Sequence, residues 1–382
     1  MVRVEVKSEL LRWARDRAGA SMEDLLPRFP RLEKWESGES RPTLKQLEAY
    51  AKATYAPVGF LFLQEPPRES IPIPDFRTMA GRTVERPSPN LLETIYACQE
   101  RQDWFRENAR TSGSERLAFV GSATLSSPVV EIAATMRNML SFDLLRRRTF
   151  ATWSEALRVF ITEADRIGVL VMCSGIVLNN THRRLDPAEF RGFALSDELA
   201  PLVFINGSDS KAAQLFTLAH ELAHLWLGQS ALSDTTIAAQ RQNEIETWCN
   251  HVAAELLVPL EALRQELRAH ERVNDAVARL ARLFKVSSLV ILQRLRAAGR
   301  LTWDELRTEY DREMERIANL SRSSGGGDFY LTAAVRYSRR FTRALVESTL
   351  EGRTLYRDAL RMLGISKTET FHELGRTLAF GG

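Results

Sequence analysis

The sequence predicts an α+β fold in which helices dominate, and three observations support this prediction. Apolar residues recur at helical spacing through much of the chain, beginning with Leu10, Leu11, Ala14 and Ala18. Short β-prone runs lie between helical stretches in the central part, and the run at residues 202–206 is the clearest of them. Segments rich in proline or glycine divide the chain, which at 382 residues is long enough for two or three domains.

Residues 1–65 are predicted to form a helical N-terminal domain. Ser21 is in position to cap a helix, because Asp24 follows three residues later in the capping-box position. The pattern of the segment rests on Leu11, Arg12, Ala14, Arg15, Ala18, Gly19, Ser21, Leu25, Trp35, Glu36, Gly38 and Pro42. These residues resemble the Cro-like helix-turn-helix family that is often labelled XRE.

The segment between Leu25 and Trp35 departs from that family. It is about one helical turn short and contains Pro27 and Pro30. The family's recognition helix enters the major groove, and a shortened helix reaches base edges less readily. Positive and negative residues are also nearly balanced here, which weakens the footprint for phosphate binding. DNA binding by this domain and docking on the rest of the chain or on a partner therefore both stay open.

Five further segments are expected after the N-terminal domain. Residues 66–80 are a proline-rich connection that we expect to lie extended along a surface. The main α+β domain is predicted at residues 81–265, with helices near 90–110, 129–139 and 154–167 and strands near 168–173, 192–195 and 201–206. The others are a basic winged-helix or helix-turn-helix-like segment at 266–320, a Gly/Ser linker at 321–328 and a helical C-terminal region at 329–382.

The chemistry of the chain is concentrated in the run His220-Glu221-Leu222-Ala223-His224. Helical positions four apart share a face, so both imidazoles can reach one metal ion. Glu221 projects beside them, toward a water on that metal. Two histidines at this spacing with an intervening glutamate are typical of the zinc ligands and general base of metalloproteases.

A catalytic zinc site needs a third protein ligand and leaves the fourth position for water. A third histidine six residues after His224 is excluded, because that position is Ser230. A carboxylate on a downstream helix is the next option, and residues 243–258 are predicted to form such a helix, ended by Pro259. Glu246 shares one face of it with Asn250, Ala253 and Leu257.

Other polar residues of this helix are weaker candidates. Glu244 points elsewhere, and Glu255 lies near the far end. His251 falls off the Glu246 face, so we expect a structural role, with contact to substrate or to an oxyanion as the alternative. Cys249 is expected to pack in the core and to serve as a ligand only if Glu246 does not.

Two separated stretches, residues 216–224 and 246–259, resemble the ImmA/IrrE family of zinc metallopeptidases. The resemblance spans roughly the central half of the chain. It implies a zincin-like metallopeptidase core in which His220, His224 and Glu246 hold Zn²⁺ and Glu221 is the catalytic base. In such peptidases an edge strand beside the metal helix binds substrate backbone, and we consider residues 202–206 for that role or for an ordinary place in the sheet.

The composition is that of an ordinary globular protein, with 44% apolar and 26% charged residues. No apolar run is long enough to span a membrane and the N-terminus has no apolar signal core, so we expect a cytoplasmic protein. Cys98, Cys173 and Cys249 are too scattered to indicate a disulfide framework. A net charge of +3 does not by itself indicate nucleic-acid binding.

The expected function is that of an intracellular zinc-dependent endopeptidase acting on a protein substrate. The resemblance implies that the substrate is a helix-turn-helix repressor, in stress response or in mobile-element or toxin–antitoxin control. The alternative is a DNA-binding transcription regulator or antitoxin with a non-catalytic metal site. Glu221 argues against it, because a purely structural site needs no base. A third reading is a toxin whose proteolysis another gene product restrains. No pattern indicates the oligomeric state.

Overall fold

The computed structural model describes residues 3–76, 87–233, 244–320 and 336–380. The chain divides into two compact units. The first consists of Met1–Pro72 with Arg82–Ile95, and the second of Ile73–Gly81 with Tyr96–Gly382. Within the described ranges, no helix is both long enough and apolar enough to cross a membrane.

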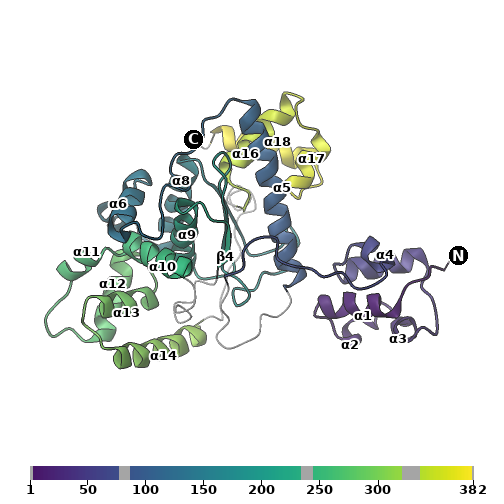
Figure 1. The fold of residues 1–382 in the computed structure, drawn as a ribbon, viewed down its shortest axis with the longest axis horizontal. Helices are drawn as coiled ribbons and strands as arrows, with labels where there is room; N and C mark the ends of the chain where they lie inside the picture. Colours follow the sequence, from purple (N-terminus) through teal and green to yellow (C-terminus); the bar gives the residue numbers. More distant parts are fainter. Residues whose placement is uncertain (1–2, 77–86, 234–243, 321–335, 381–382) are drawn as a thin grey trace. The chain divides into compact units, whose positions relative to one another are not determined.

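The first unit is helical, and its N-terminal part is drawn in purple in Figure 1. Ser21 and Asp24 form the predicted capping box: the Asp24 N–H donates to Ser21 Oγ at 3.1 Å, and the Ser21 N–H donates to Asp24 Oδ2 at 2.9 Å. The elements are α1 (Ser8–Arg17), α2 (Met22–Leu25), α3 (Leu32–Glu36), α4 (Leu44–Ala53) and the 3₁₀ helix η1 (Val58–Phe62).

The shortened segment between Leu25 and Trp35 ends in the five-residue helix α3, which the sequence pattern did not predict. Its two prolines lie in the turns before this helix. Arg15 of α1 donates two hydrogen bonds to the Glu36 carboxylate, at 2.9 and 3.2 Å. This bidentate ion pair fixes α3 against α1.

The second unit is a mostly helical α+β structure, as the sequence predicted, and it contains a small mixed sheet. Its strands are β1 (Leu170–Ser174), β2 (Gly192–Leu195), β3 (Leu202–Asn206) and β4 (Ala231–Ser233). Its helices are α6 (Val129–Met139), α7 (Leu144–Arg148), α8 (Trp153–Arg166), α9 (Lys211–Trp226), α10 (Glu244–Leu257), α11 (Leu260–Gln265), α12 (Val273–Phe284), α13 (Ser288–Ala297), α14 (Trp303–Leu320), α16 (Arg339–Leu350), α17 (Tyr356–Met362) and α18 (Thr368–Phe380). Helix α5 (Pro89–Thr111) begins in the first unit and continues into the second.

The strand order is β1-β3-β2-β4, with β1 parallel to β3 and the other two pairs antiparallel. Residues 202–206 therefore form an inner strand, so of the two readings the ordinary place in the sheet is correct and the free edge for substrate is wrong. The edge near the metal helix is β4, which the sequence did not predict as a strand because it has only three residues.

The sheet lies between helices α8 and α9 on one face and helix α5 on the other (Figure 1). Alternate residues of a strand point to opposite faces, and Val171 and Val203 belong to the core shared with α8 and α9. On the other face, Met172 meets Cys98 of α5, with their sulfur atoms 3.9 Å apart. Helix α9 packs against β2 and β3 and also contacts α8 and α10.

One hydrophobic core runs from α6 through α13. It contains Ala219 and Leu222 of α9, Ala253 of α10, Leu280 of α12 and Ile291 of α13. The helices that follow residue 265 thus share their interior with the helices that precede it.

Helices α16–α18 lie beyond the predicted Gly/Ser linker at 321–328, which falls outside the described residues. The Ser338 hydroxyl donates a hydrogen bond at 2.7 Å to Oδ1 of Asp165, which lies near the end of α8. Arg101 of α5 donates to the Met362 carbonyl at 2.9 Å. These contacts connect the C-terminal helices with the central helices of the second unit.

Candidate metal centre

The centre is built on α9, whose ends are both fixed. Ser210 caps the N-terminus by accepting a hydrogen bond from the Ala213 N–H at 3.2 Å. Gly228 adopts a left-handed φ of +68° just after the last turn, which ends the helix. Between these ends His220, Glu221 and His224 lie fully buried. The spacing of the two histidines puts both rings on the same side of the helix.

Glu246, in the first turn of α10, completes a cluster with the two histidines, in which potential ligand atoms lie within 4.8 Å of one another. The two Nε2 atoms are 3.1 Å apart, and Glu246 lies 3.2 Å from His220 Nε2 and 3.1 Å from His224 Nε2. Bonds of about 2.0–2.1 Å at tetrahedral angles place zinc ligands about 3.3 Å apart. The spacing of these three side chains therefore fits a zinc ion.

Asn250, one turn further along α10, orients the first histidine. Its side-chain Oδ1 lies 3.0 Å from His220 Nδ1. Because an amide oxygen only accepts hydrogen bonds, Nδ1 donates, and Nε2 keeps its lone pair toward the cluster. Such support of a ligating histidine is usual in metal sites. The sequence placed Asn250 on the Glu246 face but gave no partner for it.

Ser233 of β4 is a member of the centre that sequence reasoning missed. Its hydroxyl lies 3.2 Å from His224 Nε2 and donates to Glu246 Oε1 at 3.4 Å. No motif marks a serine at this distance along the chain, and only the pairing of β4 with β2 brings it to the histidines.

Glu221 lies in a space made by a glycine. A Cβ on Gly192 of β2 would lie 3.2 Å from Glu221 Oε1 and only 2.5 Å from Thr217 Cγ2. Neither carboxylate oxygen of Glu221 has a well-formed hydrogen bond to a residue in the described ranges. Burial raises the pKa of this carboxyl well above its usual range, and the Glu246 carboxylate raises it further.

The pKa of Glu246 is shifted in the opposite direction, downward. Burial alone would raise its pKa, but the charges and hydrogen bonds of His220 and His224 outweigh burial and lower the pKa to about 2. Two carboxylates in one site thus differ in proton affinity. This difference suits one for holding a cation and the other for taking up a proton.

Comparison with known proteins bears on the same residues. Residues 164–296 match the IrrE N-terminal-like domain. The match contains His220, Glu221, His224 and Glu246, so the residues that converge in the structure all fall within it.

An aligned stretch of 99 residues is 37% identical to the radiation response metalloprotease IrrE of Deinococcus deserti. The alignment covers 25% of this chain and 35% of that protein, so the chain spans about a third of the length of its relative. Residues 337–377 match a domain of unknown function, DUF8813. The Cro-like helix-turn-helix resemblance of residues 1–65 stays a prediction.

The other polar candidates of the IrrE N-terminal-like domain lie away from the cluster. Glu255 is buried and pairs with Arg294 of α13. Cys249 is fully buried in the hydrophobic core. Glu244 and His251 are exposed. Ser230 accepts a hydrogen bond from the Ser196 N–H at 2.9 Å.

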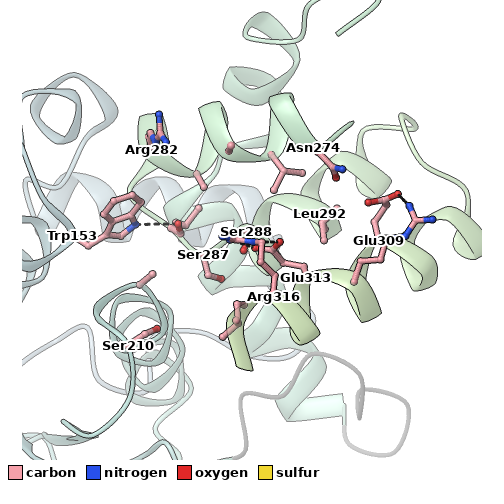
Figure 2. A pocket seen from close by; sticks show the side chains of 17 residues that line it. Trp153, Ser210, Asn274, Arg282, Ser287, Ser288, Leu292, Glu309, Glu313 and Arg316 are labelled. Atoms are coloured by element: carbon pink, nitrogen blue, oxygen red, sulfur yellow. Dashed lines mark hydrogen bonds and ion pairs between the residues drawn. The ribbon is translucent and has the colours of Figure 1, made fainter. Parts of the chain in front are cut away.

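A cavity of 640 Å³ opens elsewhere, between the first turns of α8 and α9 and helices α12–α14 (Figure 2). Several of its polar groups have partners: Ser287 caps α13, and Glu309 pairs with Arg312 at 2.6 Å. The residues around it include none of the cluster. The buried cluster rather than this cavity is therefore the candidate functional site within the residues that match the IrrE N-terminal-like domain.

Proposed function

We propose that this chain is a zinc-dependent endopeptidase. The observation that supports the proposal best is the pairing of a three-residue zinc-type cluster with a buried carboxylate, Glu221, one residue after the first ligand. A structural metal site does not need that carboxylate, whereas peptide hydrolysis needs a base.

His220, His224 and Glu246 are the proposed zinc ligands. A zinc ion bound there would polarise the scissile carbonyl and make water more acidic. Asn250 holds the His220 ring so that Nε2 faces the cluster. Gly192 leaves room for the Glu221 carboxylate beside the sheet. Glu221 accepts a proton from the attacking water at one of its oxygens and passes that proton to the leaving amine.

The proposed substrate is a protein, in the first place a helix-turn-helix repressor. The proposal is supported by the similarity of one quarter of the chain to a radiation response metalloprotease and by the resemblance of residues 1–65 to DNA-binding domains. A role in stress response or in mobile-element or toxin–antitoxin control belongs to the same proposal.

The proposal is tested by comparing the wild type with Glu221→Gln and Glu246→Ala. We expect about one zinc per chain in the wild type and in Glu221→Gln, and a loss of zinc in Glu246→Ala. Profiling of protein N-termini in cells that produce each form should show new termini with the wild type alone, within DNA-binding proteins. Identical profiles for wild type and Glu221→Gln, both loaded with zinc, would favour a regulator with a non-catalytic metal site.

A further inference from the structure

The outer edge of β4 is occupied by another segment of the same unit, Ile73–Phe76, which we call the strap. On its inner side, β4 pairs with β2. On its outer side, the Leu232 N–H donates to the Pro74 carbonyl at 2.9 Å, and the Phe76 N–H donates to the Leu232 carbonyl at 3.0 Å. The strap therefore lies parallel to β4, as an added strand.

The strap reaches the metal centre. The Phe76 ring stacks near the ring of His224, with centroids 6.3 Å apart and planes inclined by 22°. Leu232, which makes both main-chain hydrogen bonds to the strap, directly precedes Ser233 of the centre. The three residues His220, Glu221 and His224 have no exposed surface. A peptide must therefore displace something before it can reach them.

We propose that the strap is a resident occupant that closes this centre: it holds the outer edge of β4, the edge on which zinc peptidases of this kind pair an extended substrate backbone, until a substrate displaces it. The partner is an unfolded or locally unfolded peptide segment that pairs with Leu232 and presents an apolar ring toward His224. The proposal rests on the proposed function, because it names where the substrate of that activity binds. Substrate and strap compete for the same two main-chain groups.

The composition of the strap favours displacement. Proline has no N–H, so Pro74 offers β4 a carbonyl but no donor, and Pro72 before it has none either. Two main-chain hydrogen bonds and the Phe76 ring contact are thus among the interactions that attach the strap to β4 and the centre, and the buried side chain of Ile73 adds to them. Pro74 and Asp75 are exposed, whereas Ile73 is buried. A substrate strand without proline at the position of Pro74 can form one more hydrogen bond than the strap does.

Protection of a sheet edge against aggregation is the ordinary role of such a segment. The two roles differ in what happens when the strap is removed. If the strap only protects the edge, its removal exposes an aggregation-prone strand edge whose binding does not involve the metal centre. If the strap competes with substrate, its removal opens a peptide-binding site in which the bound peptide approaches His224.

The test uses the full chain loaded with zinc, in the Glu221→Gln form so that no peptide is cleaved. The probe is a fluorescein-labelled peptide of residues 71–76, Ile-Pro-Ile-Pro-Asp-Phe, and the readout is fluorescence anisotropy. In the test variant, residues 73–76 are replaced by Gly-Ser-Gly-Ser. A strap that is closed nine-tenths of the time raises the apparent Kd about tenfold. We therefore expect the variant to bind the probe about tenfold more tightly than the parent.

Two matched controls sharpen this test. A probe with an N-methylated phenylalanine cannot donate to the Leu232 carbonyl and should lose its binding to the variant. Phe76→Ala should loosen the strap with the least change in sequence, whereas Phe76→Tyr keeps the ring and should behave like the parent. Equal affinity of all forms for the probe, or equal binding of the methylated probe, would overturn the proposal.

A second readout separates this inference from the proposed activity. With Glu221 intact, the Gly-Ser variant should cleave β-casein faster than the wild type, and the free peptide should slow it. Probe binding restricted to the opened variants, without any casein cleavage, would support the strap and count against the peptidase. Equal cleavage by closed and opened forms, with no selective probe binding, would overturn the strap and leave the peptidase.

Discussion

His220 Nδ1 donates a hydrogen bond to Asn250 Oδ1 at 3.0 Å, so that α10 holds the ring that α9 contributes to the metal centre. The same helix also contributes Glu246, one turn earlier. Helix α10 therefore provides both a proposed ligand and the support of another proposed ligand. Its position relative to α9 determines the geometry of the centre.

Substitution of Asn250 tests this dependence. Asn250→Ala removes the acceptor, so the His220 ring is free to rotate, and we expect zinc affinity to fall by about 10- to 100-fold. Asn250→Asp keeps an oxygen at that place and should retain more of the affinity. Competition with a chromophoric chelator measures the Kd. The neighbouring His251→Ala serves as control, because His251 is exposed outside the cluster. An unchanged Kd in Asn250→Ala would show that the contact does not support the site.

Gly192→Ala tests the space around the base. The new Cβ would lie 2.9 Å from the Phe204 carbonyl and 3.2 Å from Glu221 Oε1. We expect kcat to fall by about 100-fold while zinc content stays near that of the wild type, because displacement of a catalytic group by about 1 Å costs that much. Gly59→Ala, where nothing lies within 4 Å, is the matched control. Parallel losses of zinc and kcat would instead indicate a general distortion.

Substitution of Arg147 is predicted to cause a large loss of folding stability. Its fully buried guanidinium donates to the carbonyls of Leu257 and Phe284, the last residues of α10 and α12, at 2.6 and 3.1 Å. Arg147→Met leaves both carbonyls without this donor, and we expect a loss of about 2–4 kcal/mol, measured by chemical denaturation. Arg148→Met, which removes a more exposed ion pair with Glu266, should cost less than about 1 kcal/mol. Equal losses for the two variants would contradict this account.

Glu163 leads to a prediction of how the stability of the fold depends on pH. Burial alone would raise its pKa, but hydrogen bonds from Arg166 and Arg146, both at 2.7 Å, outweigh burial and lower it below the usual 4.5. The unfolded chain then takes up the proton first as the pH falls. The contribution to stability is therefore present above pH 4.5 and is lost as the pH falls through the folded pKa.

The variant Glu163→Gln should consequently be about 1 kcal/mol less stable than the wild type at pH 7. The difference should shrink as the pH falls below the usual carboxyl pKa. Denaturation at a series of pH values measures it, with the exposed Glu115→Gln as control. A difference that grows toward acid pH would mean that the sign of the pKa shift is wrong.

The sequence predicted the centre better than it predicted its surroundings. His220, Glu221 and His224 lie within one helical turn or so, where local geometry alone brings them together. Glu246 followed from helical periodicity and the family resemblance. Ser233 and Gly192 did not follow, because their roles depend on the pairing of strands that are far apart in sequence. The choice between an edge and an inner place for residues 202–206 could not be made for the same reason: the sequence of a strand does not determine its position in the sheet.

The N-terminal unit also contains features that could be predicted from the sequence and one that could not. The capping box at Ser21 was readable, since both partners lie within three residues. Helix α3 was not, because its stability comes from burial of Leu32 and Trp35 and from the ion pair between Arg15 and Glu36.

The common interior of α9, α10, α12 and α13 limits how the gene can be rearranged. A fusion or crossover point between α11 and α12 would strip the partners from Leu280 and Ile291 and leave apolar surface bare. We therefore expect recombination within this block to be selected against. The match to the IrrE N-terminal-like domain, residues 164–296, contains all four of these helices, so none of them is separated from its partners at the ends of the match.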